Sequence, residues 1–381
     1  MPELRNRTLP EDGIMTIANQ ARKQAGCVRL ELGEPDFPIP EHIRQAMSAA
    51  LDQPVRYGSA AGVPSLQQAI AAKVSRVNHY TVAPEQVVIT PGGVGAVMAS
   101  LVATVSYGDE VLVPDPAWPL YSMILAQIGA TATYYPLRAE NRWLPDPAEL
   151  QSLVTPRTRA LIINTPTNPT GAVFPRSLIG ELVRFCQDHD LYLIADEAYE
   201  ELVFDGAEHV SAAALAPEET RILSCYTFSK TYAMTGLRIG YAVVPIALSA
   251  NIIQAVRCCC TNVSTLVQVG AEAALTGPQD CVSIMRDAYR KRRDIALNLL
   301  RQYDVPAYKP DGTFFLLVDV SKSGLTTSEF ALQLLKKHNV AVAPGSAFGT
   351  LANHCIRISL ASSVQDLEVG IERIATMLAS R

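Results

Sequence analysis

Residues 222–240, ILSCYTFSKTYAMTGLRIG, pass from a continuous apolar run into a polar turn that carries Lys230 and Arg238. Such an apolar run is typical of a strand that is buried on both faces of a sheet. A lysine just beyond the carboxyl end of that strand lies where open parallel sheets bind their ligands. Its amine attacks a carbonyl only when unprotonated, and a desolvated site beside a second cation such as Arg238 favours that form. The alternative for Lys230 is a solvated surface lysine.

Apolar runs of the same kind precede this stretch and alternate with segments of helical spacing. Two helical segments begin at Pro40 and Pro64, and a third covers residues 176–189. The further apolar runs are residues 87–90, 111–113, 160–163 and 191–195. Continuous apolar runs separated by helices predict a mostly parallel sheet that is covered by helices on both faces.

Beyond residue 245 the pattern becomes richer in helix. A charged helical segment at residues 285–301 leads to short apolar runs, and an amphipathic helix is predicted from Val364 onward. These short runs are residues 314–318, 340–343 and 355–360. We therefore predict an α/β protein with a large domain over residues 46–283 and a small α/β domain made from both chain ends, residues 1–45 and 284–381.

The composition allows a large buried core and excludes several classes of protein. Hydrophobic residues make up 49% of the 381 residues and charged residues 18%, and the net charge of −5 offers no basic surface for nucleic acid. Residues 1–22 lack the apolar centre of a signal peptide, and no apolar window is long enough to span a membrane. The eight cysteines contain no C-x-x-C pair and fit reduced thiols or small buried side chains, so we expect a cytoplasmic protein.

Two more polar loops follow predicted strands. NTPTNPTG, residues 164–171, follows the run at 160–163, and DEAY, residues 196–199, follows the run at 191–195. Because the carboxyl ends of parallel strands share one edge of a sheet, we expect both loops to meet Lys230 in one crevice. A carboxylate at such a strand end, here Asp196, needs a positive partner such as a protonated pyridine nitrogen, or else it caps a helix.

Other familiar motifs are incomplete. Gly93 and Gly95 begin a G-x-G pattern, but Met98 stands where the dinucleotide fingerprint needs its third glycine. The six histidines have no metal-ligand spacing, so we predict no metal site and expect these histidines to be surface or helix residues.

Taken in order, these segments resemble the class I and II aminotransferases of pyridoxal-5′-phosphate (PLP) fold type I, an aspartate aminotransferase-like family, over nearly the whole chain. The resemblance is carried by SKTYAMTGLRIG at residues 229–240, GEPDF at 33–37, NPTG at 168–171 and DEAY at 196–199. It implies a homodimeric enzyme with shared active sites. The enzyme would transfer the amino group of an L-amino acid to a 2-oxo acid by a ping-pong mechanism, through a Schiff base between PLP and Lys230.

The resemblance also implies a role for each matching residue. Lys230 would bind PLP and shuttle a proton, Asp196 would pair with the ring nitrogen, and Asn168 and Tyr199 would contact the ring oxygen. Arg357, with the Gly33 amide and Asn168 nearby, would hold the substrate carboxylate. Trp118 would lie against the cofactor ring. The phosphate would be bound by the amides of Gly93 and Val94 and by the side chains of Thr227, Ser229 and Arg238. Tyr57 would reach the phosphate from the neighbouring subunit.

Each residue also has a purely structural interpretation. Asn168 can shape a turn, Trp118 and Tyr199 can belong to the core, and Arg357 can form a surface ion pair. The same holds for the residues with the least individual support, namely Tyr57, Gly93, Val94, Thr227 and Ser229.

Three questions of function stay open at this point. Another fold type I PLP enzyme, such as an eliminating lyase, a synthase or a decarboxylase, would use the same residues, whereas a transcription regulator would need a helix-turn-helix domain for which the chain has no room.

The amino donor and oxo acid are also undefined. Val94 stands where a bacterial aspartate-specific subgroup has a lysine, which argues against a dicarboxylic preference. We further hypothesise that Arg257 and residues 258–262 help to set side-chain specificity in the neighbouring subunit.

Overall fold

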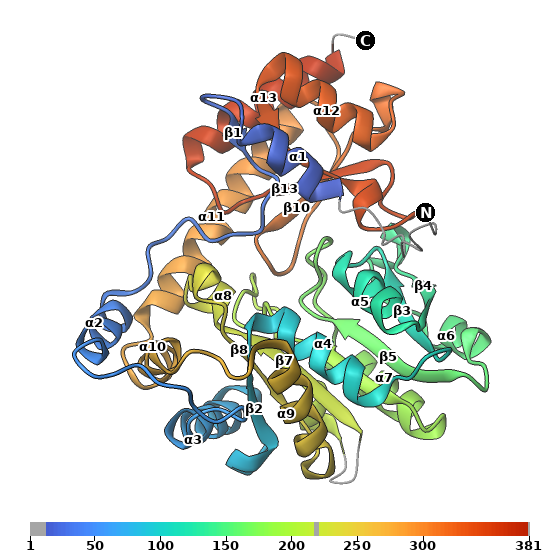
Figure 1. Ribbon diagram of the computed structural model, residues 1–381. Coiled ribbons are helices and arrows are strands. Elements are labelled where there is room, and N and C mark those ends of the chain that lie inside the picture. The colour runs from blue at the N-terminus through green and yellow to red at the C-terminus, as the bar shows by residue number, and fades with distance from the viewer. Residues whose placement is uncertain (1–12, 217–220, 380–381) are drawn as a thin grey trace, which may run out of the picture.

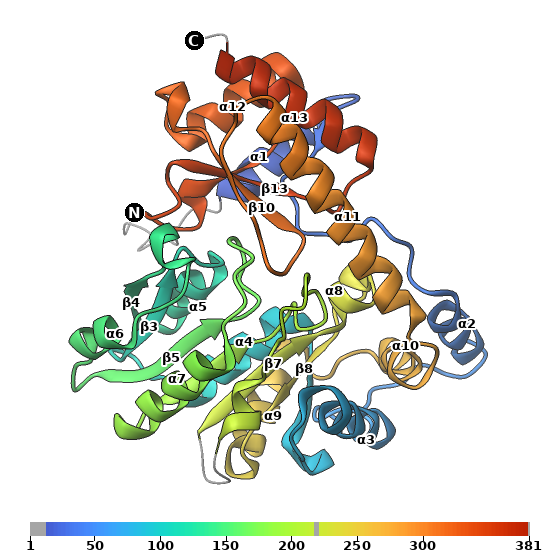
Figure 2. The ribbon, with the colours of Figure 1, turned by 180° about the vertical axis from the view of Figure 1, so that it is seen from behind.

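The computed structural model describes residues 13–216 and 221–379. Figures 1 and 2 show two units, one containing a large twisted sheet and the other containing α11 (Asp280–Gln302), α12 (Thr327–His338) and α13 (Val364–Ala379) around smaller sheets. Helix α11 extends from one unit to the other. The predicted absence of a signal peptide concerns a segment whose first twelve residues lie outside the described part of the chain.

The large sheet has seven strands in the order β2-β8-β7-β6-β5-β3-β4. Their bounds are β2 (Val87–Thr90), β3 (Glu110–Asp115), β4 (Thr131–Pro136), β5 (Thr158–Asn164), β6 (Tyr192–Asp196), β7 (Ile222–Thr227) and β8 (Gly240–Val243). All neighbouring strands are parallel except β8, which runs antiparallel to both β2 and β7. The predicted α/β fold with a mostly parallel sheet is therefore confirmed, although β4 and β8 were not among the predicted strands.

Helices cover both faces of this sheet, as the continuous apolar runs predict. Along β5, Ala160 and Ile162 join a buried cluster with α4 (Gly92–Thr104), α5 (Leu120–Ile128) and α9 (Ile246–Cys260). The alternate residues Leu161 and Ile163 join a second cluster on the opposite face. That second face is covered by α6 (Pro147–Leu153) and α7 (Arg176–Asp188). Successive strand residues point to opposite faces, so a strand buried on both sides has no polar alternation.

A third group of helices packs beside β2 and β8. It consists of α2 (Glu41–Ala50), α3 (Pro64–Lys73) and α10 (Thr265–Thr276). Their apolar faces meet in one buried cluster, to which Ile43 of α2 and Ile70 of α3 contribute. Helix α3 continues directly into one turn of π-helix, Val74–Asn78.

The smaller unit is built from both ends of the chain. Strand β1 (Val28–Arg29) pairs in parallel with β11 (Val340–Ala341), and α1 (Gly13–Ala21) packs against α12. An antiparallel four-stranded sheet holds β12 (Ala343–Pro344), β13 (Cys355–Ser359), β10 (Phe315–Asp319) and β9 (Ala307–Tyr308). The predicted boundaries at 45/46 and 283/284 fall inside α2 and α11 and stay predictions. None of the helices in the described ranges is both long enough and apolar enough to cross a membrane.

Candidate active site

A cavity of about 320 Å³ lies between the carboxyl ends of the large-sheet strands and the smaller unit. The three polar loops that follow β5, β6 and β7 all reach it, as the sequence predicts. Each predicted site residue except Tyr57 lines this cavity: Gly33, Gly93, Val94, Trp118, Asn168, Asp196, Tyr199, Thr227, Ser229, Lys230, Arg238 and Arg357.

Lys230 lies on the short helix α8 (Phe228–Thr231), directly after β7. Its Nζ donates a hydrogen bond of 2.6 Å to the carbonyl oxygen of Gly33, which belongs to the smaller unit's side of the cavity. Loss of solvation in the cavity lowers the pKa of Lys230 to about 8, and the cations Arg238 and Arg357 act in the same direction. A far larger share of this amine is therefore neutral near pH 7 than of a solvated lysine.

Asp196 ends β6 and is 6% exposed. Burial raises the pKa of its carboxyl to about 6, while hydrogen bonds to the carboxylate oppose this rise. The stronger of these bonds comes from the Tyr121 hydroxyl, 2.5 Å from Oδ2, and the Ala198 amide donates to Oδ1 at 3.2 Å. The carboxyl is consequently mostly ionised at neutral pH despite its burial.

Tyr121 is a site residue that the sequence analysis missed. It lies on α5, is 0% exposed, and meets the ring of Trp118 edge to face at 5.5 Å. The only local signal was its position three residues after Trp118, and nothing in the sequence connects it to a carboxylate 75 residues away.

One end of the cavity is suited to an anion. Helix α4 begins at Gly92, so the amides of Gly93 and Val94 lie in its first turn, where a helix is positively polarised. Gly92 has φ +76°, and a Cβ at this position would lie 2.5 Å from a guanidinium nitrogen of Arg238. Glycine thus allows Arg238 to approach the start of the helix. Amides and a guanidinium at one place form a strong phosphate site.

Thr227 and Ser229 line the cavity at the start of α8. The Thr227 side chain caps this helix by accepting a hydrogen bond of 3.1 Å from the Ser229 amide. Both residues therefore have a structural contact in addition to their position at the cavity.

Arg357 occupies the centre of β13 and is 2% exposed. Its Nη1 donates to Asn168 Oδ1 at 2.8 Å and its Nη2 to the Glu31 carbonyl at 2.6 Å. The guanidinium carbon lies 3.9 Å from the ring centre of Phe315 and 4.7 Å from that of Phe348. The structure excludes the surface position that the alternative interpretation required.

Asn164, the first residue of the predicted polar loop 164–171, has no role predicted from the sequence and joins two of the loops. Its Oδ1 accepts from the Asn168 amide at 2.8 Å, and its Nδ2 donates to the Asp196 carbonyl at 2.9 Å. The loop 164–171 is thereby held against the end of β6, which sets the distance between Asn168 and Asp196.

Tyr199 and Tyr57 have opposite environments. Tyr199 is 6% exposed and lies with its ring edge toward Phe314 and Phe315, each at 5.7 Å, and burial raises its pKa. Tyr57, between α2 and α3, is 90% exposed and does not line the cavity of its own chain. Its predicted contact with a neighbouring subunit stays a prediction. The same holds for the specificity role of Arg257, which is exposed and also lies outside this cavity.

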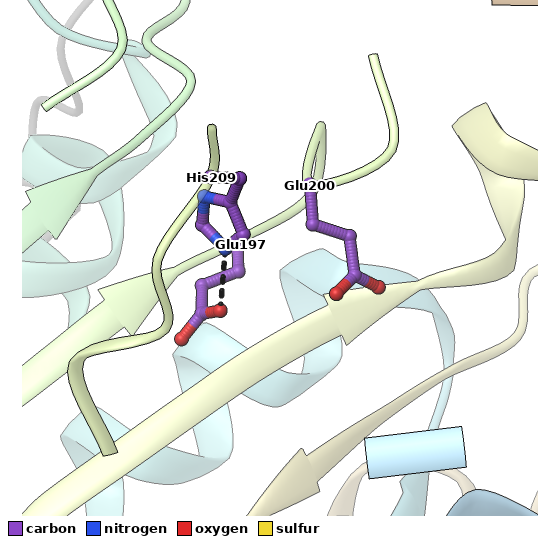
Figure 3. Close-up of side chains that lie close together, drawn as sticks. All are labelled: Glu197, Glu200 and His209. Atoms are coloured by element: carbon purple, nitrogen blue, oxygen red, sulfur yellow. Dashed lines mark hydrogen bonds and ion pairs between the residues drawn. The ribbon is translucent and has the colours of Figure 1, made fainter. Parts of the chain in front are cut away.

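A second polar cluster, Glu197, Glu200 and His209, follows Asp196 (Figure 3). His209 Nε2 donates to Glu197 Oε2 at 2.8 Å, and the His209 side chain is only 7% exposed. Burial acts to raise the pKa of Glu197, but the bonds from His209 and Ser211 outweigh it and leave this pKa below its usual value. The expectation that all histidines lie on the surface or in helices is therefore wrong for His209, which is in a loop and has a buried side chain.

The three side chains offer possible metal ligands within 4.8 Å of one another. Both carboxylates already have partners within the protein, since Glu197 accepts from His209 and Ser211, and Glu200 forms an ion pair with the buried Lys73 and accepts from Asn78 Nδ2 at 2.6 Å. The cluster thus anchors the turn after Asp196 through internal hydrogen bonds and the Lys73–Glu200 ion pair.

Comparison with known proteins agrees with this arrangement. The family model described as "Aminotransferase class I and II" matches residues 25–374. The aspartate/prephenate aminotransferase of Thermus thermophilus is 37% identical over 361 residues, covering 94% of this chain and 92% of that protein. An arginine–pyruvate transaminase of Pseudomonas aeruginosa is 38% identical, with 92% and 89% covered. The structure of Thermus thermophilus aspartate aminotransferase with maleate superposes with a TM-score of 0.93 at 35% identity, with 99% of this chain and 100% of that chain covered. The chain therefore belongs to the class I and II aminotransferases.

Proposed function

We propose that this aminotransferase binds PLP in the cavity described above, with Lys230 as the amine that carries it, and transfers the amino group of an L-amino acid to a 2-oxo acid. The observation that supports this most directly is the placement of Lys230, Asp196 and Arg238 in one cavity, each with an environment matched to a different part of PLP.

The residues present fit the cofactor at each of its polar groups. The partly neutral amine of Lys230 suits the aldehyde, and the buried, ionised carboxylate of Asp196 suits a protonated ring nitrogen. The start of α4 and Arg238 suit the phosphate, together with Thr227 and Ser229. The remaining contacts would be Trp118 on the ring face, and Asn168 and Tyr199 at the ring oxygen. When bound, PLP supplies an electron-withdrawing ring that stabilises negative charge at the substrate Cα.

The chain's own groups have distinct tasks in the transfer. The Nζ of Lys230, neutral in a useful fraction because of its lowered pKa, removes the proton from the substrate Cα and later returns one. Arg357 binds the substrate carboxylate with its planar fork and so fixes the direction in which the Cα–H bond points. Asp196, mostly ionised at neutral pH, would pair with a protonated ring nitrogen of the cofactor.

We further propose a homodimer in which Tyr57 reaches the phosphate end of the neighbouring subunit's cavity. A tyrosine that is 90% exposed on an irregular segment supports this, because large aromatic side chains are usually at least partly buried. All eight cysteines are free thiols, which supports a cytoplasmic location.

A single-turnover experiment tests the reaction. The PLP-loaded enzyme is mixed with one L-amino acid and no acceptor, and 2-oxo acid, ammonia and carbon dioxide are measured. Amino transfer releases one equivalent of 2-oxo acid per subunit and then stops, since no acceptor regenerates the enzyme. Continuous release of ammonia or carbon dioxide would instead indicate an eliminating or decarboxylating enzyme.

A further inference from the structure

We infer that the preferred amino donors of this enzyme carry uncharged, apolar side chains, an inference that rests on the proposed function. It starts from apolar side chains that line the cavity and to which the proposed cofactor and carboxylate contacts assign no role. These side chains, which we call the apolar wall, are Ile14, Met15, Leu32, Val94 and Leu120; of Val94 only the backbone amide is assigned to the phosphate.

The apolar wall is assembled from separate parts of the chain. Ile14 and Met15 come from α1, Leu32 from the segment after β1, and Val94 and Leu120 from the first turns of α4 and α5. Ile14 is 8% exposed and packs with Phe348, Ala343 and Leu32 in a small buried cluster. This packing holds Ile14 and Leu32 in place, so an apolar side chain finds a preformed surface at this part of the wall.

The charged residues that line the cavity also favour an amino donor with an uncharged side chain. Among the lining residues in the described part of the chain, the cations are Lys230, Arg238 and Arg357, and the proposed function assigns one to the amine, one to the phosphate and one to the α-carboxylate. A second carboxylate, as in aspartate or glutamate, would lose water against the apolar wall without gaining a cation from the described residues of the same chain. Burial of an unmatched charge is strongly unfavourable.

Amino donors with a cationic side chain are also disfavoured. The single carboxylate that lines the cavity among the described residues is Asp196, which is held by Tyr121 and proposed to face the ring nitrogen. The side chain of lysine or arginine would therefore meet the apolar wall with no acidic partner among the described residues of the same chain. A phenylalanine, leucine or methionine side chain would instead bury its own apolar surface.

The test compares amino donors on the PLP-loaded enzyme. We expect kcat/KM for L-phenylalanine, L-leucine and L-methionine to exceed that for L-aspartate, L-glutamate and L-lysine by about 100-fold. Binding of two unreactive carboxylates, 3-phenylpropionate and succinate, is measured by calorimetry as a second readout, and 3-phenylpropionate should bind more tightly. Equal or better use of aspartate or lysine would overturn the inference but leave the proposed function intact. Failure of every amino acid to release its oxo acid would refute the proposed function instead.

A matched pair of variants locates the effect. Ile14→Ala shortens the apolar wall and should lower kcat/KM for L-phenylalanine about tenfold, and that for L-alanine much less, because the short side chain of alanine buries less surface there. The control is Ile246→Ala, at an isoleucine that is 60% exposed at the start of α9 and should change neither value. Equal losses for both donors in Ile14→Ala would contradict the assignment. If this variant does not fold, the calorimetric comparison on the unchanged protein decides.

Discussion

Replacing Tyr121 with phenylalanine tests whether a residue outside direct contact with the substrate sets the charge of Asp196. The substitution keeps the ring against Trp118 and removes only the hydroxyl that lies 2.5 Å from Asp196 Oδ2. A hydrogen bond to a buried charged group contributes about 1.5–3 kcal/mol. Since 1.36 kcal/mol corresponds to about one pH unit, the pKa of Asp196 should rise from about 6 to about 7 or higher.

The consequence depends on pH in a definite direction. Asp196 is ionised above its pKa, so the unchanged enzyme keeps this charge at pH 7 and loses it as the pH falls through about 6. In Tyr121→Phe the same loss occurs at higher pH, and PLP should bind several-fold more weakly at pH 7 than in the unchanged enzyme. Raising the pH to about 9 ionises Asp196 in both proteins and should bring the two affinities together.

The assay is a titration of the apoenzyme with PLP between pH 5.5 and 9, followed by fluorescence, with kcat/KM measured at the same pH values. Tyr135→Phe is a matched control, because the Tyr135 hydroxyl is equally buried but donates to the neutral carbonyl of Ile162 at 2.8 Å. The control should leave the pH dependence unchanged. A ratio of affinities between Tyr121→Phe and the unchanged enzyme that stays constant across this range would refute the reasoning, since a purely structural defect has no reason to vanish at high pH.

Three further substitutions test other parts of the site. Arg357→Ala should raise KM for amino and oxo acids about 100-fold, with the PLP affinity little changed, because a bidentate contact to the substrate carboxylate is lost. An unaltered KM would show that Arg357 does not bind the substrate carboxylate. Gly92→Ala should weaken PLP binding about tenfold by calorimetry, because the added Cβ would lie against the Arg238 guanidinium. Gly108 has a similar positive φ but open space around it, so Gly108→Ala should leave PLP binding unchanged. Equal effects of the two substitutions would indicate backbone strain alone. His209→Ala should lower the free energy of unfolding by about 3 kcal/mol in urea denaturation, because it removes a donor from the buried Glu197; a change within experimental error would show that the pair has no net effect on stability.

The strands that could be predicted from the sequence are those with uniform burial. Strand β7 is buried at every position, so its apolar run is visible without knowledge of its neighbours. Strand β4 lies at the edge of the sheet, and Thr131 and Tyr134 are exposed, which leaves no continuous apolar run. Strand β8 is short and begins at Gly240, so the sequence pattern there predicts only the end of a turn.

In the site, too, the residues that could be predicted are those whose position follows from a buried strand. Lys230 and Asp196 come directly after buried strands, so their convergence follows from the topology of a parallel sheet. The contact between Tyr121 and Asp196 depends on how α5 packs over the sheet, and the ion pair between Lys73 and Glu200 joins residues 127 positions apart. Neither partner carries a local signal of the other, so such pairs cannot be found from one sequence.

Reduction of the PLP-loaded enzyme with borohydride, followed by peptide mapping, tests the central claim most directly. The lysine environment described above predicts one pyridoxyl group per subunit, on the peptide that contains Lys230, and none in Lys230→Ala. A pyridoxyl group on a different lysine, or none on the Lys230 peptide of the unchanged enzyme, would contradict the account.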